Sequence, residues 1–130
     1  MTPTAIAFTV YPVENLARAR RFYEEVLGLV ATHAVGNEEQ GFVEFDLGPH
    51  TLALGKIGLF QPGPAGGKVA IEVRDFEAAI ARLRERGVTF VFEPTETPVC
   101  HMAGCHDSEG NIFIVHQRKP DLAGPAIKDQ

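Results

Sequence analysis

Hydrophobic and polar positions along the chain follow one order of elements twice. Residues 5–13 predict a strand, and an apolar stripe of helical spacing follows between Asn15, a suitable N-cap, and Gly28, a suitable helix end. Short apolar or alternating runs then predict strands at 29–35, 41–48 and 51–55. The second half predicts strand 68–73, a helix from N-cap Asp75 to Gly87, strand 88–92, a proline-containing loop at 93–98, and strands 99–106 and 112–119.

The two helix starts, Asn15 and Asp75, lie sixty residues apart, so the pattern is an internal repeat. Neither half buries its helix and sheet well alone, and we expect the halves to share a surface. The prediction is one α+β domain of two tandem βαβββ modules, with curved mixed sheets around a cavity and helices on the outer face. Its parts are a first module at 1–57, a linker rich in glycine and proline at 58–67, a second module at 68–119 and a tail at 120–130.

The hairpin at 98–119 holds both cysteines and three of the five histidines. Residues 107–111, Asp-Ser-Glu-Gly-Asn, predict its turn, because Asp and Asn side chains bond nearby backbone and Gly accepts positive φ. If the turn pairs His106 with Ile112, alternation places His116 on one face with Cys100, Met102, Gly104 and His106. A register slip of one residue exchanges the two faces.

The charge balance excludes two classes of partner. The formal net charge is -5 and basic residues are interleaved with acids, so we expect neither nucleic acid nor a membrane surface as a partner. No apolar run reaches the roughly 18 to 20 residues that span a bilayer, and the N-terminus lacks a basic segment before an apolar one. We therefore expect a cytoplasmic protein in which Cys100 and Cys105 are free thiols.

Several motifs together resemble the vicinal oxygen chelate superfamily, which includes glyoxalase I, bleomycin-resistance and fosfomycin-resistance proteins and extradiol dioxygenases. The resemblance covers residues 5–119 and implies the same two-module fold. It also implies a homodimer, in which modules pair within one chain or across the twofold axis to close a cavity. The motifs are Asn-Leu at 15–16, Arg-Arg-Phe-Tyr at 20–23, Val-Leu-Gly-Leu at 26–29, Val-Arg-Asp-Phe-Glu-Ala-Ala at 73–79, and the turn at 107–111.

Metal-dependent members of that superfamily place His, Gln or Glu at four cavity positions, on the first and last strand of each module. The resemblance puts these positions at Phe8, Ala53, Lys68 and Ile114, of which three have no donor atom and the lysine repels a cation. No metal or other cofactor is expected, which argues against glyoxalase, fosfomycin-transferase and dioxygenase chemistry. A divalent metal at a non-standard site is the alternative.

Two functional hypotheses remain, with a small molecule as the expected partner in both. The first is a glyoxalase/bleomycin-resistance-like protein that binds a small organic molecule in its cavity. The second is a lyase, isomerase or dioxygenase-like enzyme with His116 or Lys68 as acid or base and Cys100 as nucleophile. A buried cysteine, a bonded histidine and structural ion pairs are the non-functional interpretations of the same residues. The ligand-binding candidates are Phe8, Phe42, Lys68, Glu72, Cys100, Met102, His106 and His116.

Overall fold

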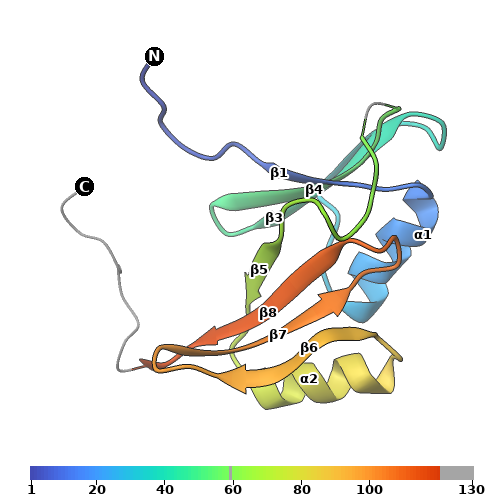
Figure 1. Ribbon diagram of the computed structural model, residues 1–130. Helices are drawn as coiled ribbons and strands as arrows, with labels where there is room; N and C mark the ends of the chain where they lie inside the picture. Colours follow the sequence, from blue (N-terminus) through green and yellow to red (C-terminus); the bar gives the residue numbers. More distant parts are fainter. Residues whose placement is uncertain (59, 121–130) are drawn as a thin grey trace.

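The computed structural model describes residues 1–58 and 60–120. Within them the order strand, helix, three strands occurs twice (Figure 1). The first set is β1 (Thr9–Pro12), α1 (Leu16–Arg21) with a following π-helix η1 (Phe22–Val26), β2 (His33–Gly36), β3 (Gly41–Leu47) and β4 (His50–Lys56). The second set is β5 (Val69–Glu72), α2 (Phe76–Glu85), β6 (Phe90–Glu96), β7 (Cys100–His106) and β8 (Ile112–Arg118).

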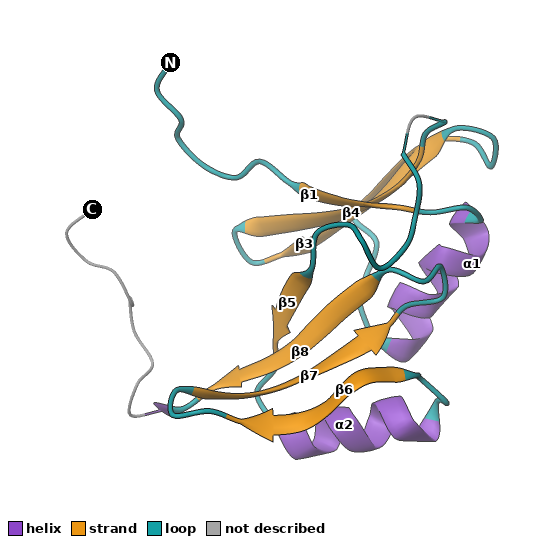
Figure 2. Ribbon diagram, in the orientation of Figure 1, coloured by secondary structure: helices purple, strands orange, loops and turns teal. Residues whose placement is uncertain are grey.

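Each set forms one four-stranded mixed sheet, in the orders β1-β4-β3-β2 and β5-β8-β7-β6. In each sheet the first strand pairs parallel with the last, and the other pairs are antiparallel. The α+β prediction with two βαβββ modules is confirmed. Figure 2 shows α2 lying along one face of the second sheet, while α1 lies beside the turn between β7 and β8. No helix in the described part of the chain is long and apolar enough to cross a membrane.

Both predicted N-caps are confirmed. The Asn15 side chain accepts a hydrogen bond from Arg18 N at 2.9 Å, and that of Asp75 accepts one from Ala78 N at 3.0 Å. The first helix differs from the prediction of one regular helix: α1 ends at Arg21 and continues as η1, where Leu27 N donates to Phe22 O, five residues back.

The register of the β7–β8 hairpin is the one assumed from its turn. His106 lies opposite Ile112, and Met102 lies opposite His116. Phe113 and Val115 are therefore buried on the helix side, while His116 shares the other face with Cys100, Met102 and His106.

Three strands differ in their bounds from the prediction, and one of them is β2, which begins at His33 and not at residue 29. The loop expected at 93–98 is wrong for 93–96, because β6 continues to Glu96 through two register shifts. Strand β6 is the edge of its sheet, where Pro94 interrupts no ladder between two neighbours. Strand β1 begins at Thr9 and not at residue 5, and the exposed residues before it extend away from the sheet (Figure 1). The predicted tail lies outside the described residues from position 121 onward.

The two modules share one hydrophobic core, as expected from their size. Tyr23 stacks on Phe45 of the first sheet with ring centroids 6.0 Å apart, and Phe22 contacts Phe113 of the second sheet edge-on, also at 6.0 Å. A single cluster of buried side chains therefore runs through both modules. Their relative position is fixed by packing as well as by the linker.

Tyr11 links the modules through the ladder between β5 and β8. Its hydroxyl accepts a hydrogen bond from Val69 N at 2.7 Å and donates one to Ile112 O at 2.5 Å. Two rungs further along, Val73 N donates directly to His116 O. The hydroxyl of the first module thus occupies the place of a backbone hydrogen bond in the second.

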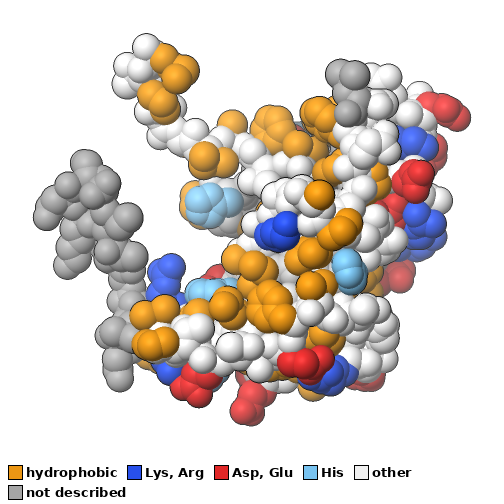
Figure 3. Space-filling model, viewed as in Figure 1, with side chains coloured by type: hydrophobic (Ala, Val, Ile, Leu, Met, Phe, Trp, Pro, Cys, Tyr) orange, Lys and Arg blue, Asp and Glu red, His pale blue; other side chains and the backbone are white. Residues whose placement is uncertain are grey.

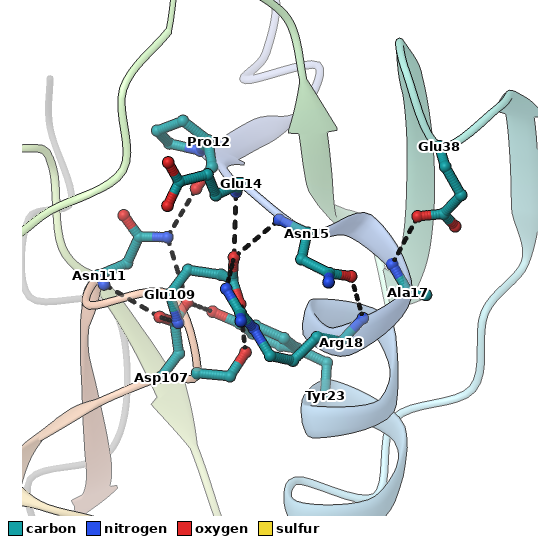
Figure 4. A network of polar contacts seen from close by, with 11 residues as sticks. Pro12, Glu14, Asn15, Ala17, Arg18, Tyr23, Glu38, Asp107, Glu109 and Asn111 are labelled. Atoms are coloured by element: carbon teal, nitrogen blue, oxygen red, sulfur yellow. Dashed lines mark hydrogen bonds and ion pairs between the residues drawn. The ribbon is translucent and has the colours of Figure 1, made fainter.

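The turn at 107–111 inserts polar side chains into the first module (Figure 4). The Tyr23 hydroxyl donates to Asp107 Oδ2 at 2.7 Å, and Asn111 Nδ2 donates to Pro12 O at 2.8 Å. The buried Asp107 carboxylate and the buried phenol satisfy one another, which removes the cost of burying either alone. The turn is therefore a structural connector between the modules.

Glu109 of the same turn caps α1 from outside its own module. Its carboxylate accepts hydrogen bonds from the backbone N of Glu14 and of Asn15, each at 3.0 Å, and from Arg18 Nε at 2.7 Å. Burial acts to raise the pKa of this carboxyl, but the hydrogen bonds from Arg18, Asn15, Ser108 and Glu14 outweigh it and lower the pKa to about 2. The charged carboxylate is thus held at the positive end of a helix.

Candidate functional site

A cavity of about 660 Å³ lies where the two modules diverge. One wall is the β3–β4 hairpin with Leu47, His50, Thr51 and Leu52, and the other is strand β5 with His116 and Arg118 of β8. Figure 3 shows hydrophobic side chains gathered over this face of the molecule, which is hollowed between its upper and lower parts on the left. Because both modules contribute, the cavity exists only in the assembled domain.

Glu72 and His116 form the most directed polar contact in this cavity. They occupy partner positions on the parallel strands β5 and β8, with both side chains on the face away from the helices. His116 Nδ1 lies 2.5 Å from Glu72 Oε1, and Glu72 Oε2 accepts a hydrogen bond from Arg118 N at 2.7 Å. Both carboxylate oxygens are therefore engaged, and the imidazole ring has a fixed orientation.

The electrostatics of Glu72 follow from these contacts. Burial acts to raise the pKa of its carboxyl, but the hydrogen bonds from Arg118 N and His116, with the charges of both residues, lower the pKa below its usual value. Glu72 is thus ionised at neutral pH. A carboxylate at Nδ1 orients the imidazole and leaves Nε2 for an external partner, an arrangement used for acid–base work and for binding polar ligands.

Two predicted ligand-binding residues of the first module lie on the face of its sheet opposite the buried Val43 and Phe45. Phe8 and Phe42 contact each other edge-on, with ring centroids 6.5 Å apart. Phe8 is 46% exposed, so this aromatic pair is an accessible surface and not part of the core. Neither ring borders the cavity that holds Glu72 and His116.

Lys68 does not direct its charge into the cavity. Its amine donates hydrogen bonds to Pro64 O at 2.8 Å and Gly66 O at 2.9 Å, both in the segment between the modules. The predicted linker is thus tied to the start of β5. An ammonium group already bonded to two carbonyls is poorly placed to act as a base.

The remaining candidates, Cys100, Met102 and His106, share the face of His116 as parity predicted. Met102 is directly opposite His116, but Cys100 is opposite Arg118, one position further along that face. Cys100 is only 5% exposed, and its Sγ lies 3.2 Å from Thr97 Oγ1. His106 Nδ1 is buried and has no hydrogen-bond partner within the described residues. Of the three, only Met102 approaches the Glu72–His116 pair.

Sequence reasoning missed Arg118, His50 and Thr51 as cavity residues. Arg118 had a usable signal, because it lies two positions after His116 on the same strand and therefore on the same face. His50 and Thr51 had none, since their place in the cavity depends on how the modules pack.

The four positions that the superfamily resemblance associates with a metal do not gather liganding atoms here. Ala53 lies opposite Val10, and Ile114 lies opposite Ala70. Within residues 1–58 and 60–120, no group of three or more His, Cys, Asp or Glu side chains is placed to hold a metal ion.

A second hollow, of about 630 Å³, lies at the start of α2 and is built by the second module alone. Phe76 and His101 stack there with centroids 5.6 Å apart. Gln117 accepts from Phe76 N and donates to Arg74 O, each at 2.8 Å, so its amide already serves the fold. The cavity between the modules, with its directed imidazole, is the stronger candidate.

Comparisons with known proteins cover nearly the whole chain. A family model described as Glyoxalase/Bleomycin resistance protein/Dioxygenase superfamily matches residues 5–115. No curated protein matches at a significant level. Many solved structures share the fold, including the following three. TnmS3, an antibiotic binding protein from Streptomyces sp. CB03234, is 24% identical with a TM-score of 0.78, over 92% of this chain and 99% of that one. A glyoxalase/bleomycin resistance protein from the same organism is 25% identical with a TM-score of 0.73, over 87% and 100%. Lactoylglutathione lyase from Agrobacterium tumefaciens is 20% identical with a TM-score of 0.69, over 90% and 96%.

Proposed function

Because the chain belongs to the glyoxalase/bleomycin resistance protein/dioxygenase superfamily, we propose that it binds a small organic molecule in the cavity between its modules. The observation that carries this proposal is a cavity of about 660 Å³ with apolar side chains on both walls and one oriented imidazole, which are the features of a small-molecule site. The description of TnmS3 as an antibiotic binding protein supports the same type of function.

We also propose that binding does not use the superfamily's metal. Phe8, Ala53, Lys68 and Ile114 supply no donor set for a divalent ion. Metal analysis of the purified protein tests this directly, and one tightly bound divalent ion per chain would contradict it.

Probe binding tests the cavity itself. N-phenyl-1-naphthylamine is a neutral apolar fluorophore, and its fluorescence is expected to rise when it enters the cavity. Ala70→Phe places a ring on the exposed, cavity-lining face of β5 and is expected to weaken binding at least tenfold. Ala81→Phe, at an exposed position of α2, is the matched control. Equal binding to both variants would place the probe elsewhere and contradict the proposed site.

The proposed assembly is a homodimer. Edge strands β2 and β6 carry exposed valines, Val35 at 64% and Val91 at 45%, and unpaired sheet edges in soluble proteins are normally covered or blunted. A second copy would cover them and give two equivalent cavities. Light scattering at micromolar concentration distinguishes a homodimer from a monomer, because a mass near 14.1 kDa is that of one chain and would contradict the dimer.

An enzymatic function is the second candidate, and the contact between His116 and Glu72 favours it. A carboxylate-oriented imidazole is a suitable acid or base, whereas Lys68 is bonded to carbonyls and Cys100 is buried. Mass spectrometry of a bound ligand after incubation distinguishes the candidates. A ligand recovered unchanged supports binding, and a product that disappears in His116→Gln supports catalysis.

A further inference from the structure

We infer that the cavity recognises an anionic oxygen, a carboxylate or a phenolate, on an otherwise apolar small molecule, and that Arg118 and His116 hold it. The inference rests on the proposed function and names the ligand class of that site. It follows from which polar groups of the cavity are already satisfied and which are not.

Glu72 is the only acidic side chain that borders this cavity among the described residues. Its two oxygens are engaged by His116 Nδ1 at 2.5 Å and by Arg118 N at 2.7 Å. The carboxylate therefore serves the imidazole and offers little to an incoming cation. A basic ligand would also meet the Arg118 charge.

Arg118 and His116 each present to the cavity a polar group that has no partner inside the described part of the protein. Within residues 1–58 and 60–120, the Arg118 guanidinium makes no hydrogen bond or ion pair, and His116 Nε2 makes no hydrogen bond. The two residues are neighbours on the cavity-side face of β8, two positions apart. Together they present an unpaired guanidinium and an oriented ring nitrogen to the same space.

The chemistry of this pair fits an acid. A ligand that enters as the neutral acid transfers its proton from its oxygen to His116 Nε2, whereas a ligand that is already ionised binds together with one proton that the same nitrogen takes up from solvent. An anionic ligand oxygen then faces an imidazolium whose charge Glu72 balances. The guanidinium of Arg118 supplies the second, charge-assisted contact. No electrons are transferred, and the proton returns when the ligand leaves.

The other walls determine the rest of the ligand. Leu47 and Leu52 on one side, and Val69 and Ile71 on the other, provide apolar contacts. Thr9, His50 and Thr51 are the remaining polar lining residues; Thr9 begins β1, and the other two lie on the β3–β4 wall. An amphipathic acid with an apolar body therefore matches both parts of the cavity.

Two fluorophores with nearly the same aromatic body test the inference at pH 7. 1-Anilinonaphthalene-8-sulfonate carries an anionic group, and N-phenyl-1-naphthylamine lacks it. We expect the sulfonate to bind the wild-type protein about tenfold more tightly, because charge-assisted hydrogen bonds are stronger than contacts between neutral groups. Arg118→Gln and His116→Gln should each weaken the sulfonate about tenfold and leave the neutral probe unchanged.

Arg86→Gln is the control for net charge, since it removes a cation from the end of α2 that does not border the cavity. Circular dichroism checks that each variant is folded. Equal affinities for the two probes, or equal losses in Arg118→Gln and Arg86→Gln, would overturn the inference. If one of these results is obtained and Ala70→Phe still weakens binding of the neutral probe, the cavity binds small molecules without recognising an anion, and the proposed function stands. Binding of neither probe would contradict both.

Discussion

Replacing Glu109 with glutamine should destabilise the protein, because the side chain joins the modules and caps α1. The substitution keeps the shape but removes the charge that two backbone amides and Arg18 bind. The pKa of Glu109 falls from 4.5 to about 2 in the folded state. At about 1.4 kcal/mol per pH unit, that difference corresponds to at most about 3.5 kcal/mol of stability.

Arg18 is 48% exposed, so its part of this energy is screened by solvent. We therefore expect Glu109→Gln to lower the free energy of unfolding by about 2 kcal/mol at pH 7. The sign of the pH dependence follows from the lowered pKa. The contribution is complete above pH 4.5 and is lost as the pH falls towards about 2, so wild type and variant converge in acid.

Urea unfolding followed by circular dichroism at pH 7 and pH 3 measures both effects. Glu39→Gln is the control, because Glu39 is an exposed acid of the β2–β3 turn whose side chain makes no hydrogen bond within the described residues. Two results would refute the reasoning. One is a Glu109→Gln variant with the same free energy of unfolding as this control at pH 7. The other is a difference in free energy of unfolding between wild type and Glu109→Gln that is as large at pH 3 as at pH 7.

Three further predictions follow from buried groups. Tyr11→Phe removes the hydroxyl that bridges β5 and β8 and should lower the free energy of unfolding in urea by about 1–3 kcal/mol. An unchanged free energy of unfolding would show that Val69 N and Ile112 O pair directly without the hydroxyl. Burial raises the pKa of the Cys105 thiol to about 11. The thiol should therefore resist Ellman's reagent at pH 8 in the native state and react after unfolding. Labelling of Cys105 in the native protein would contradict its buried position. A Cβ at Gly104 would lie 2.3 Å from the Phe92 ring, so Gly104→Ala should lower the melting temperature, and Phe92→Ala in the same chain should relieve part of that clash.

The repeat and the hairpin register were predictable because local chemistry determines them. Asn15 and Asp75 cap helices through their own side chains, and the turn at 107–111 sets the pairing of His106 with Ile112. Alternation then places Glu72 and His116 on one face. Predictions of this kind need only neighbours in sequence and the period of a strand.

Features that depend on tertiary packing were not predictable in this way. The π-helical turn at Phe22–Val26 has no turn or cap signal, and β6 continues past Pro94 because it happens to be an edge strand. Lys68 had the right parity for the cavity, but its flexible side chain reaches two loop carbonyls instead. His50 borders the cavity only because the β3–β4 turn comes to face β5.

The capping of α1 by Glu109 has a consequence for how this protein folds during its synthesis on the ribosome. The backbone amides of Glu14 and Asn15 receive their partner from a residue made 95 and 94 positions later. The first half therefore leaves the ribosome with these two amides unpaired within the protein, although Asn15 already caps Arg18 N, and they gain their partner only after the last hairpin has been translated. Because contacts this distant in sequence form slowly, the nascent chain should depend on its final strands to complete its earliest ones. A premature stop before the 107–111 turn would thus leave the front half incomplete along with the back.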